Sequence, residues 1–299
     1  MRIKLYLLII FILLFILPLF SIDFTKFIEN VKNIPDKIFY YKSLDGTKLA
    51  YRVISPEKPK AVLIFIHGIS VYGKYYIPFA KMLAENGIKV YLPDLRGHGN
   101  SEGKRGDSPH PYALVQDLGI FYQLIIKENT DIPIYLGGHS MGASLTLKYV
   151  KELSLSPSGL ILIAGGLPIE RISPKSNKVL KIKTLSKIFQ FLTNIFPHFR
   201  IISWDLPKEI KDPLLVNNYS LSFFQSAFPY DIKNIWTNIN LPTFVIIGEK
   251  DEFYEKEDLE KIFEKYKKEN IKFILLPDAN HFDILEKSIN YIIEWILGG

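Results

Sequence analysis

The chain has 299 residues, of which 48% are hydrophobic and 14% aromatic, and its formal net charge at pH 7 is +6. This length and composition predict one large domain after a separate N-terminal hydrophobic segment, because α/β folds often exceed the usual domain size. Cysteine is absent, which excludes a disulfide framework, a thiol nucleophile, a thiolate metal site and lipid attachment at an N-terminal cysteine.

The first predicted element is an uncharged apolar stretch over residues 5–22, which follows a basic start. As a helix these eighteen residues would reach about 27 Å, just enough to cross a thin hydrocarbon core. A cleaved signal peptide would end in small residues, and here only Ser21 meets that requirement. We therefore predict that residues 1–22 are a membrane anchor and that the catalytic domain is exported. Secretion after signal cleavage is the alternative.

Residues 23–36 are predicted to be a linker, and residues 37–299 the globular domain. Within that domain, short apolar runs that predict buried strands alternate with helical patterns. This alternation indicates an α/β fold with a mostly parallel sheet and right-handed crossovers. The runs that carry the argument are 61–66, 132–136, 160–164, 243–248 and 271–276.

Residues 138–142 form a G-x-S-x-G pentapeptide, Gly-His-Ser-Met-Gly, between the apolar run 132–136 and a predicted helix at 143–150. A sharp turn from strand to helix leaves no room for side chains beside the serine, which explains the two flanking glycines, and it exposes the serine Oγ at the sheet's edge. The helix N-terminus points its free N–H groups at any oxyanion formed there. We predict that Ser140 is a nucleophile and that the Met141 N–H is one oxyanion donor.

A serine nucleophile needs a base to take its proton, and the base needs an acid to orient it. In this fold the chain order is serine, acid, histidine. His281 is the only histidine near the end of the chain, just after the last predicted strand, so it is predicted to be the base. Asp251, the third residue after the preceding strand, is predicted to be the acid. Glu249 and Asp278 are the alternatives, although Asp278 is better explained as a turn residue.

The second oxyanion donor should come from the loop after the strand at 61–66. That strand runs into His67-Gly68-Ile69-Ser70. The backbone N–H of Ile69 is the candidate, paired with that of Met141. Because both donors are main-chain groups, the identity of the side chains matters little. His67 is predicted to stabilise the geometry of the loop.

Residues 94–106, with the sequence DLRGHGNSEGKRG, resemble the loop after the fourth strand in monoacylglycerol lipases and bacterial lysophospholipases of the α/β-hydrolase superfamily. The pentapeptide at 138–142, His-Gly at 67–68 and Asp-Pro-Leu at 212–214 are similar to the same branch. The resemblance covers about residues 37 to 299. It implies an α/β-hydrolase fold with an eight-stranded, mostly parallel sheet flanked by helices, and a lid inserted after the sixth strand.

Two residues depart from the family's pattern. Ala143 stands where the family often has a further glycine, and Ile69 is bulkier than the small residue common there. We expect Ala143 to alter helix packing behind the serine slightly and Ile69 to narrow the acyl pocket. Neither removes a reacting group.

An inserted cap is predicted over residues 167–236, because about seventy residues separate the strand at 160–164 from the next one. Within it, residues 171–200 contain seven basic side chains and no acidic one. Apolar residues recur there at helical spacing, which predicts an amphipathic helix that packs on the core or rests on anionic lipid. The repeating positions are Ile182, Leu185, Phe189, Leu192 and Phe196.

The combined prediction is a membrane-attached serine hydrolase that cleaves carboxylic esters of the monoacylglycerol or lysophospholipid type through an acyl-enzyme. No cofactor, metal or nucleic acid is expected, since G-x-G-x-x-G, P-loop and H-E-x-x-H motifs are absent. The expected partners are a lipid-like ester and a membrane, contacted by residues 1–22 and by the basic cap at 171–200. The expected oligomeric state is a monomer or a weak homo-oligomer.

Three alternative functions remain open. A thioesterase or an S33-type aminopeptidase would use the same triad. The peptidase would need an anionic group to hold the substrate ammonium, and the basic segment at 171–200 argues against it. The third alternative is a non-catalytic, membrane-tethered binding module.

Overall fold

The computed structural model describes residues 27, 31, 34–168, 195–203 and 212–298. The predicted membrane anchor at 1–22 and most of the predicted amphipathic helix of the cap therefore lie outside the described residues. In the described part of the chain, no helix is long and apolar enough to cross a membrane.

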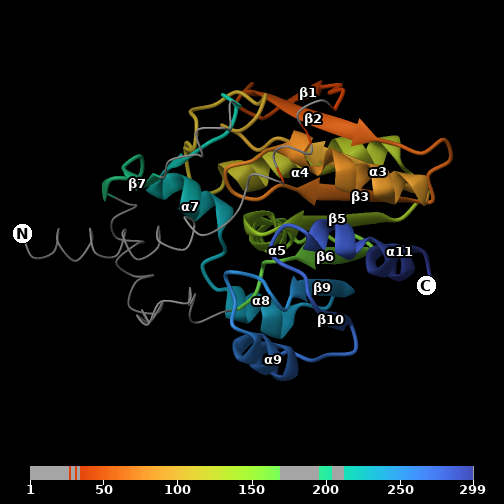
Figure 1. Ribbon diagram of the computed structural model, residues 1–299. Coiled ribbons are helices and arrows are strands. Elements are labelled where there is room, and N and C mark those ends of the chain that lie inside the picture. The colour runs from red at the N-terminus through yellow and green to blue at the C-terminus, as the bar shows by residue number, and fades with distance from the viewer. Residues whose placement is uncertain (1–26, 28–30, 32–33, 169–194, 204–211, 299) are drawn as a thin grey trace, which may run out of the picture.

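The centre of the molecule is a mixed sheet of eight strands in the order β1-β2-β4-β3-β5-β6-β9-β10 (Figure 1). β2 pairs antiparallel with both β1 and β4, and all other neighbouring strands are parallel. The predicted α/β-hydrolase sheet is thus confirmed. The strands are β1 (Phe39–Lys42), β2 (Lys48–Ile54), β3 (Ala61–Ile66), β4 (Ile88–Pro93), β5 (Ile134–His139), β6 (Gly159–Ile163), β9 (Thr243–Gly248) and β10 (Ile271–Leu276).

Helices cover both faces of this sheet, which explains why its central strands are continuous apolar runs rather than alternating ones. In β3, Val62 and Ile64 belong to one core cluster, whereas Leu63 and Phe65 belong to the other. The first cluster includes residues of α4 (Ala113–Glu128), α5 (Met141–Leu153) and α9 (Lys256–Lys265). The second includes residues of α3 (Ile77–Glu85), which follows the 3-10 turn η2 (Gly73–Tyr76), and of α10 (Ile284–Lys287) and α11 (Ile289–Leu297).

Three predicted strands, 61–66, 243–248 and 271–276, have the same bounds in the structure. The strand predicted at 132–136 instead covers residues 134–139. Its last residues include two glycines, which carry no apolar signal although they are buried in the sheet. A Cβ on Gly137 would lie 2.7 Å from the main-chain oxygen of Ile161 on β6, so close strand packing requires a glycine there.

The region between β6 and β9 holds a small two-stranded antiparallel sheet, β7 (Arg200–Ser203) and β8 (Asn218–Ser220), and two short helices, α7 (Leu221–Ala227) and α8 (Ile232–Asn238). In Figure 1, β7 and α7 lie at one end of the central sheet. We call residues 195–203 and 212–238 the described cap. Its buried Trp236 donates a hydrogen bond to the main-chain oxygen of Gly166 (2.8 Å), which fixes α8 to the loop after β6.

Lys148 of α5 also fixes the described cap, because its ammonium group is buried and donates to three main-chain oxygens. Two of the acceptors, Gln225 (2.6 Å) and Ser226 (3.0 Å), belong to α7, and the third is Pro111 (3.1 Å). The cap is thus attached directly to the helix that begins after Ser140.

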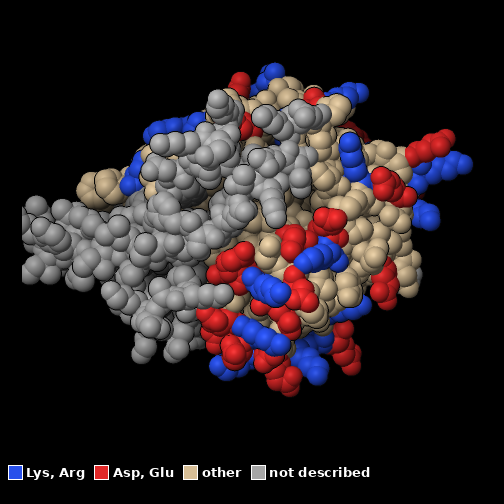
Figure 2. Space-filling view, viewed as in Figure 1, with Lys and Arg blue, Asp and Glu red and all other residues tan. Residues whose placement is uncertain are grey.

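The surface around α9 carries both signs of charge. Figure 2 shows Lys, Arg, Asp and Glu side chains interspersed over the lower part of the view, where α9 lies. Acidic residues occupy the first turn of α9 and Lys265 the last, an arrangement that the helix dipole favours. Leu259 is the buried residue of this helix, so α9 is an amphipathic surface helix.

Candidate active site

Ser140 lies at a strained turn between β5 and α5, with φ 56° and ψ −119°. A non-glycine residue with positive φ costs of order 1–3 kcal/mol and persists only where the surroundings enforce it. The flanking glycines are required for this geometry. A Cβ on Gly142 would overlap the main-chain oxygen of Ile66, and a Cβ on Gly138 would overlap the backbone of Gly142. The half-buried Ser140 therefore sits where the sequence predicts a sharp elbow.

Asp251 and His281 form a buried pair. The Nδ1 of His281 lies 2.8 Å from Oδ2 of Asp251, and the two residues are 2% and 3% exposed, respectively. The other carboxylate oxygen of Asp251 accepts a hydrogen bond from the Phe253 N–H (3.0 Å). Since a carboxylate is the acceptor, Nδ1 of His281 carries the proton and Nε2 keeps its lone pair. A histidine in this tautomer can act as a base.

The backbone of His281 is attached to the residue that precedes Ser140. Nε2 of His139 lies 2.7 Å from the main-chain oxygen of His281, and the two imidazole rings are 4.8 Å apart. The Ser140 N–H in turn donates to the main-chain oxygen of Ile163 at the end of β6 (2.9 Å). The loops after β5, β9 and β10 therefore meet at one edge of the sheet. The described hydrogen bonds include none between Ser140 Oγ and His281 Nε2, and such bonds are often long before substrate binds.

The two alternative acids lie in ion pairs away from the imidazole. Glu249 pairs with Lys256 (2.9 Å). Asp278 pairs with Lys250 (2.6 Å), has φ 57° and is exposed. The neighbouring Lys250 lowers the pKa of Asp278. Of the three carboxylates considered, Asp251 is the one that reaches the ring of His281.

The loop after β3, residues 67–71, is here called the oxyanion loop. Three of its amides have acceptors: Gly68 donates to Tyr76 Oη (2.9 Å), Ser70 to Tyr219 Oη (2.7 Å) and Val71 to the oxygen of Ile69 (2.9 Å). The N–H groups of Ile69 and Met141 have no acceptor among the described hydrogen bonds. These two amides are the donors that the sequence analysis assigns to an oxyanion.

Tyr76 and His139 connect the oxyanion loop to His281. Because Tyr76 Oη accepts from the Gly68 N–H, its own proton is directed to Nδ1 of His139 (3.0 Å). Nε2 of His139 then donates to the main-chain oxygen of His281. Burial, and secondly the electrostatic influence of the adjacent His281 imidazole, hold the pKa of His139 well below 6.5, so the His139 ring stays neutral. The roles of Tyr76 and His139 could not be predicted from the sequence. The only local signal is the position of His139 inside the pentapeptide.

His67 has the structural role that the sequence analysis predicts. Its Nδ1 donates to the oxygen of Gly68 (2.8 Å), and its Nε2 accepts from the Leu95 N–H (3.0 Å). Burial lowers the pKa of His67 to about 4, so it remains a neutral link between the oxyanion loop and the loop after β4.

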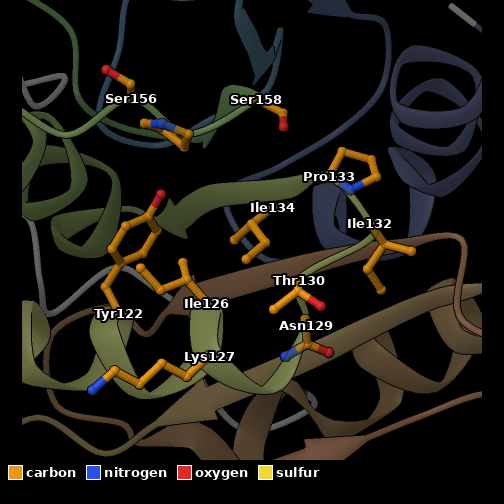
Figure 3. Close-up of a pocket in the computed structure, with 11 residues that line it drawn as sticks. Tyr122, Ile126, Lys127, Asn129, Thr130, Ile132, Pro133, Ile134, Ser156 and Ser158 are labelled. Carbon is orange, nitrogen blue, oxygen red and sulfur yellow. The ribbon is translucent and has the colours of Figure 1, made fainter.

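A separate hollow of about 460 Å³ lies at the opposite edge of the sheet. Figure 3 shows it beside Ile134, the first residue of β5, whereas Ser140 follows the last residue of that strand. It is therefore not part of the candidate active site. Its lining residues are Tyr122, Ile126, Lys127, Asn129, Thr130, Ile132, Pro133, Ile134, Ser156, Pro157 and Ser158. No cluster of three or more potential metal ligands occurs among the described residues.

The mixed eight-stranded sheet, with a serine elbow after β5, an aspartate after β9 and a histidine after β10, defines an α/β-hydrolase. Comparison with known families gives the finer assignment. The chain belongs to the family described as serine aminopeptidase, S33, whose family model matches residues 57–288.

Two relatives and one solved structure show what the chain is similar to. It is 32% identical to a rat monoglyceride lipase over 152 residues, which cover 50% of this chain and 49% of the rat protein. It is 26% identical to a Thermoplasma volcanium proline iminopeptidase over 282 residues, which cover 84% of this chain and 92% of the iminopeptidase. A soluble variant of Saccharomyces cerevisiae monoglyceride lipase, crystallised with a substrate analogue, superposes with a TM-score of 0.71 at 21% sequence identity. The superposition covers 89% of this chain and 95% of the yeast chain.

The monoglyceride lipase relatives are matched over only part of their length, and the yeast structure is similar at low sequence identity. The chain spans about half the length of the mammalian monoglyceride lipases that it matches. The likeness to the yeast structure shows the fold alone, since its sequence identity is low.

Proposed function

We propose that the protein is a serine hydrolase that cleaves carboxylic esters of the monoacylglycerol or lysophospholipid type through an acyl-enzyme. One observation carries the proposal. The buried Asp251–His281 pair is fixed next to the elbow, because the ring of His139, the residue that directly precedes Ser140, donates a hydrogen bond to the main-chain oxygen of His281.

In the proposed mechanism, Ser140 Oγ attacks the ester carbonyl while Nε2 of His281 takes the serine proton. Asp251 keeps the imidazole in the productive tautomer and stabilises its charged form. When the tetrahedral intermediate collapses, His281 gives that proton to the leaving alcohol and an acyl-serine remains. Water then attacks the acyl-serine, its proton passes to His281, and the carboxylic acid leaves as the proton returns to Ser140.

The Ile69 and Met141 N–H groups are proposed to stabilise the oxyanion. The amides of Gly68, Ser70 and Val71 in the same loop already have acceptors. The Ile69 and Met141 N–H groups have none among the described hydrogen bonds, so they can donate to a developing charge without losing an existing bond. Removing one donor of this kind typically costs about 3 kcal/mol of transition-state stabilisation.

The substrate class rests on the relatives and on the predicted cap. Three relatives of this chain, from rat, mouse and human, are monoglyceride lipases. A cap over the serine would exclude water and supply apolar wall for an acyl chain, and each buried methylene contributes about 0.8 kcal/mol. Membrane attachment through residues 1–22, with the catalytic domain exported, remains a proposal that the sequence alone supports. Contact of the basic segment at 171–200 with anionic lipid is a proposal on the same basis.

An aminopeptidase is the second candidate, and Glu252 is the observation that favours it. Its Oε2 accepts a hydrogen bond from the His281 N–H (3.1 Å), so an anionic group lies beside the proposed base. A substrate's terminal ammonium group could pair with such a carboxylate. The family description and the Thermoplasma volcanium relative agree with this candidate.

Hydrolysis of a substrate panel by the full chain, with Ser140→Ala as the matched control, separates the two candidates. The panel contains 4-nitrophenyl butyrate to palmitate, a monoacylglycerol, a lysophospholipid and an aminoacyl anilide. We expect Ser140-dependent turnover of the long-chain glycerol or lysolipid esters. Turnover of the anilide that falls in Glu252→Gln would instead favour the aminopeptidase. Turnover of short esters alone would refute the lipid assignment.

A further inference from the structure

We infer that Tyr219 and His98 are positioning residues that set the direction of the Ile69 N–H and thereby connect the cap to the oxyanion loop. The inference rests on the proposed function, because it concerns how one of the proposed oxyanion donors is held. Neither side chain is expected to touch the substrate.

The backbone next to Ile69 is strained and is restrained from the cap. Ser70 has φ 72°, a value that L-residues rarely adopt, and it is 1% exposed. Its N–H donates to Tyr219 Oη (2.7 Å), and its main-chain oxygen accepts from the Val216 N–H (2.9 Å). The Ser70 N–H and the Ser70 carbonyl are therefore both held by the described cap, whereas the Ile69 carbonyl accepts from the Val71 N–H within the loop.

The tyrosine hydroxyl is itself fixed by a histidine. Nδ1 of His98 lies 3.1 Å from the main-chain oxygen of Arg96, which can only accept, so Nδ1 carries the proton. Nε2 of His98 then accepts from the Tyr219 hydroxyl (3.0 Å), whose lone pair accepts from Ser70. Burial holds the pKa of His98 well below 6.5 and raises that of Tyr219, so both groups keep these protonation states over the physiological range.

This chain of hydrogen bonds joins three segments that are distant in sequence. Ser70 follows β3, His98 follows β4, and Tyr219 lies on β8 of the cap. The rings of His98 and Tyr219 stack at 5.6 Å, and both pack against Phe223 of α7, at 5.1 Å and 4.7 Å. All three side chains are completely buried. Because these rings are in contact and hydrogen-bonded to the loop, we infer that a displacement of β8 would be transmitted to the oxyanion loop.

Loss of the Tyr219 hydroxyl would leave the Ser70 N–H and His98 Nε2 without a partner in a buried site. Ser70 could then relax from its positive φ. This change would rotate the Ile69–Ser70 peptide and, through the dihedral angles of Ile69, the neighbouring Gly68–Ile69 peptide that carries the Ile69 N–H. An oxyanion donor acts only within a narrow range of distance and direction, so a small rotation lowers kcat with little change in KM. The ring would stay in place, because Tyr219→Phe keeps its stacking on His98.

The test compares Tyr219→Phe with Tyr91→Phe in the full-length protein. Tyr91 is a matched control, since its buried hydroxyl also donates one hydrogen bond, to Glu128, and accepts one, from Asn129, at the opposite edge of the sheet. We expect kcat to fall about 10- to 100-fold in Tyr219→Phe and less than 2-fold in Tyr91→Phe. The thermal stabilities of the two variants should be similar.

The affinity for a long-chain trifluoromethyl ketone distinguishes positioning of the oxyanion donor from a purely structural role of Tyr219, because a purely structural role would leave this affinity unchanged. The ketone forms a hemiketal oxyanion with an active serine, so its affinity should fall in parallel with kcat in Tyr219→Phe. If Tyr219→Phe does not fold, His98→Phe tests the same junction by removing the acceptor of the tyrosine hydroxyl, and a 3- to 30-fold fall in kcat is expected.

Wild-type kcat and ketone affinity in the folded variant would overturn the inference. Failure of the proposed function is a distinct outcome: wild-type protein would then show no Ser140-dependent hydrolysis of any ester.

Discussion

His139 donates a hydrogen bond from Nε2 to the main-chain oxygen of His281 across 2.7 Å. The residue that precedes the proposed nucleophile thus holds the backbone of the proposed base. Nδ1 of His139 also accepts a hydrogen bond from the Tyr76 hydroxyl, and that hydroxyl accepts one from the Gly68 N–H. The oxyanion loop is therefore connected to the His139 ring as well. The nucleophile, the base and the oxyanion loop are thus connected by one set of buried hydrogen bonds. We expect a substitution that breaks this set to displace all three.

Asp251→Asn tests the assignment of the acid. An asparagine can donate to Nδ1 of His281 and so favours the unproductive tautomer, and we expect kcat for 4-nitrophenyl butyrate to fall about 10⁴-fold. Glu249→Gln is the control, because Glu249 pairs with Lys256 at the surface and should be dispensable. An Asp251→Asn variant that retains more than a tenth of wild-type kcat would show that another carboxylate serves as the acid.

Gly142→Ala tests the geometry of the elbow. Its Cβ would overlap the main-chain oxygen of Ile66, so the start of α5 must shift and the Met141 N–H with it. We expect a loss of more than about 100-fold in kcat, or a protein that does not fold. Gly119→Ala on α4 is the control, since its Cβ would meet only the end of the partly exposed Leu153 side chain, at 2.9 Å. Equal activity of the two variants would contradict the proposed elbow.

Ser140→Gly should distinguish the backbone strain at Ser140 from the role of its hydroxyl in catalysis. Ser140 holds φ 56°, which glycine adopts without penalty, so removing the Cβ should stabilise the fold by about 1 kcal/mol while turnover disappears. Urea unfolding would measure the gain relative to Ser140→Ala, which keeps the strain. A Ser140→Gly variant no more stable than Ser140→Ala would mean that the turn is relaxed.

Features that depend on residues close in sequence, such as the strands and the elbow, could be predicted well. Contacts between segments that are distant in sequence could not. The strands at 61–66, 243–248 and 271–276 are apolar because both of their faces are buried, so periodicity alone finds them. The pairing of Ser70 with Tyr219 joins positions 149 residues apart and has no local signal. The same is true of the β7–β8 sheet, whose short strands carry no distinctive pattern.

Lys148 should make stability depend on pH. Burial lowers its pKa to about 8 in the folded protein, whereas the unfolded chain keeps the ordinary 10.5. Between these values the unfolded chain binds a proton that the folded protein has released, so the free energy of unfolding rises with pH. The rise from this group is at most about 1.4 kcal/mol per pH unit.

Urea unfolding of wild type and Lys148→Met at several pH values measures this contribution. We expect the difference in unfolding free energy between the two proteins to grow in favour of wild type from pH 8 upward. Lys151→Met, at an exposed position of the same helix, should show no such growth. A constant difference would mean that the three carbonyl oxygens around Lys148 keep it charged.

Labelling with a fluorophosphonate tests the central claim most directly, because the probe forms a stable adduct with an activated serine. Intact-mass and peptide mass spectrometry of the treated full chain should show a single adduct, mapped to Ser140. Ser140→Ala should give no adduct at unchanged thermal stability, and Tyr91→Phe should label like wild type. An adduct of the same yield in Ser140→Ala, or none in wild type, would contradict the account.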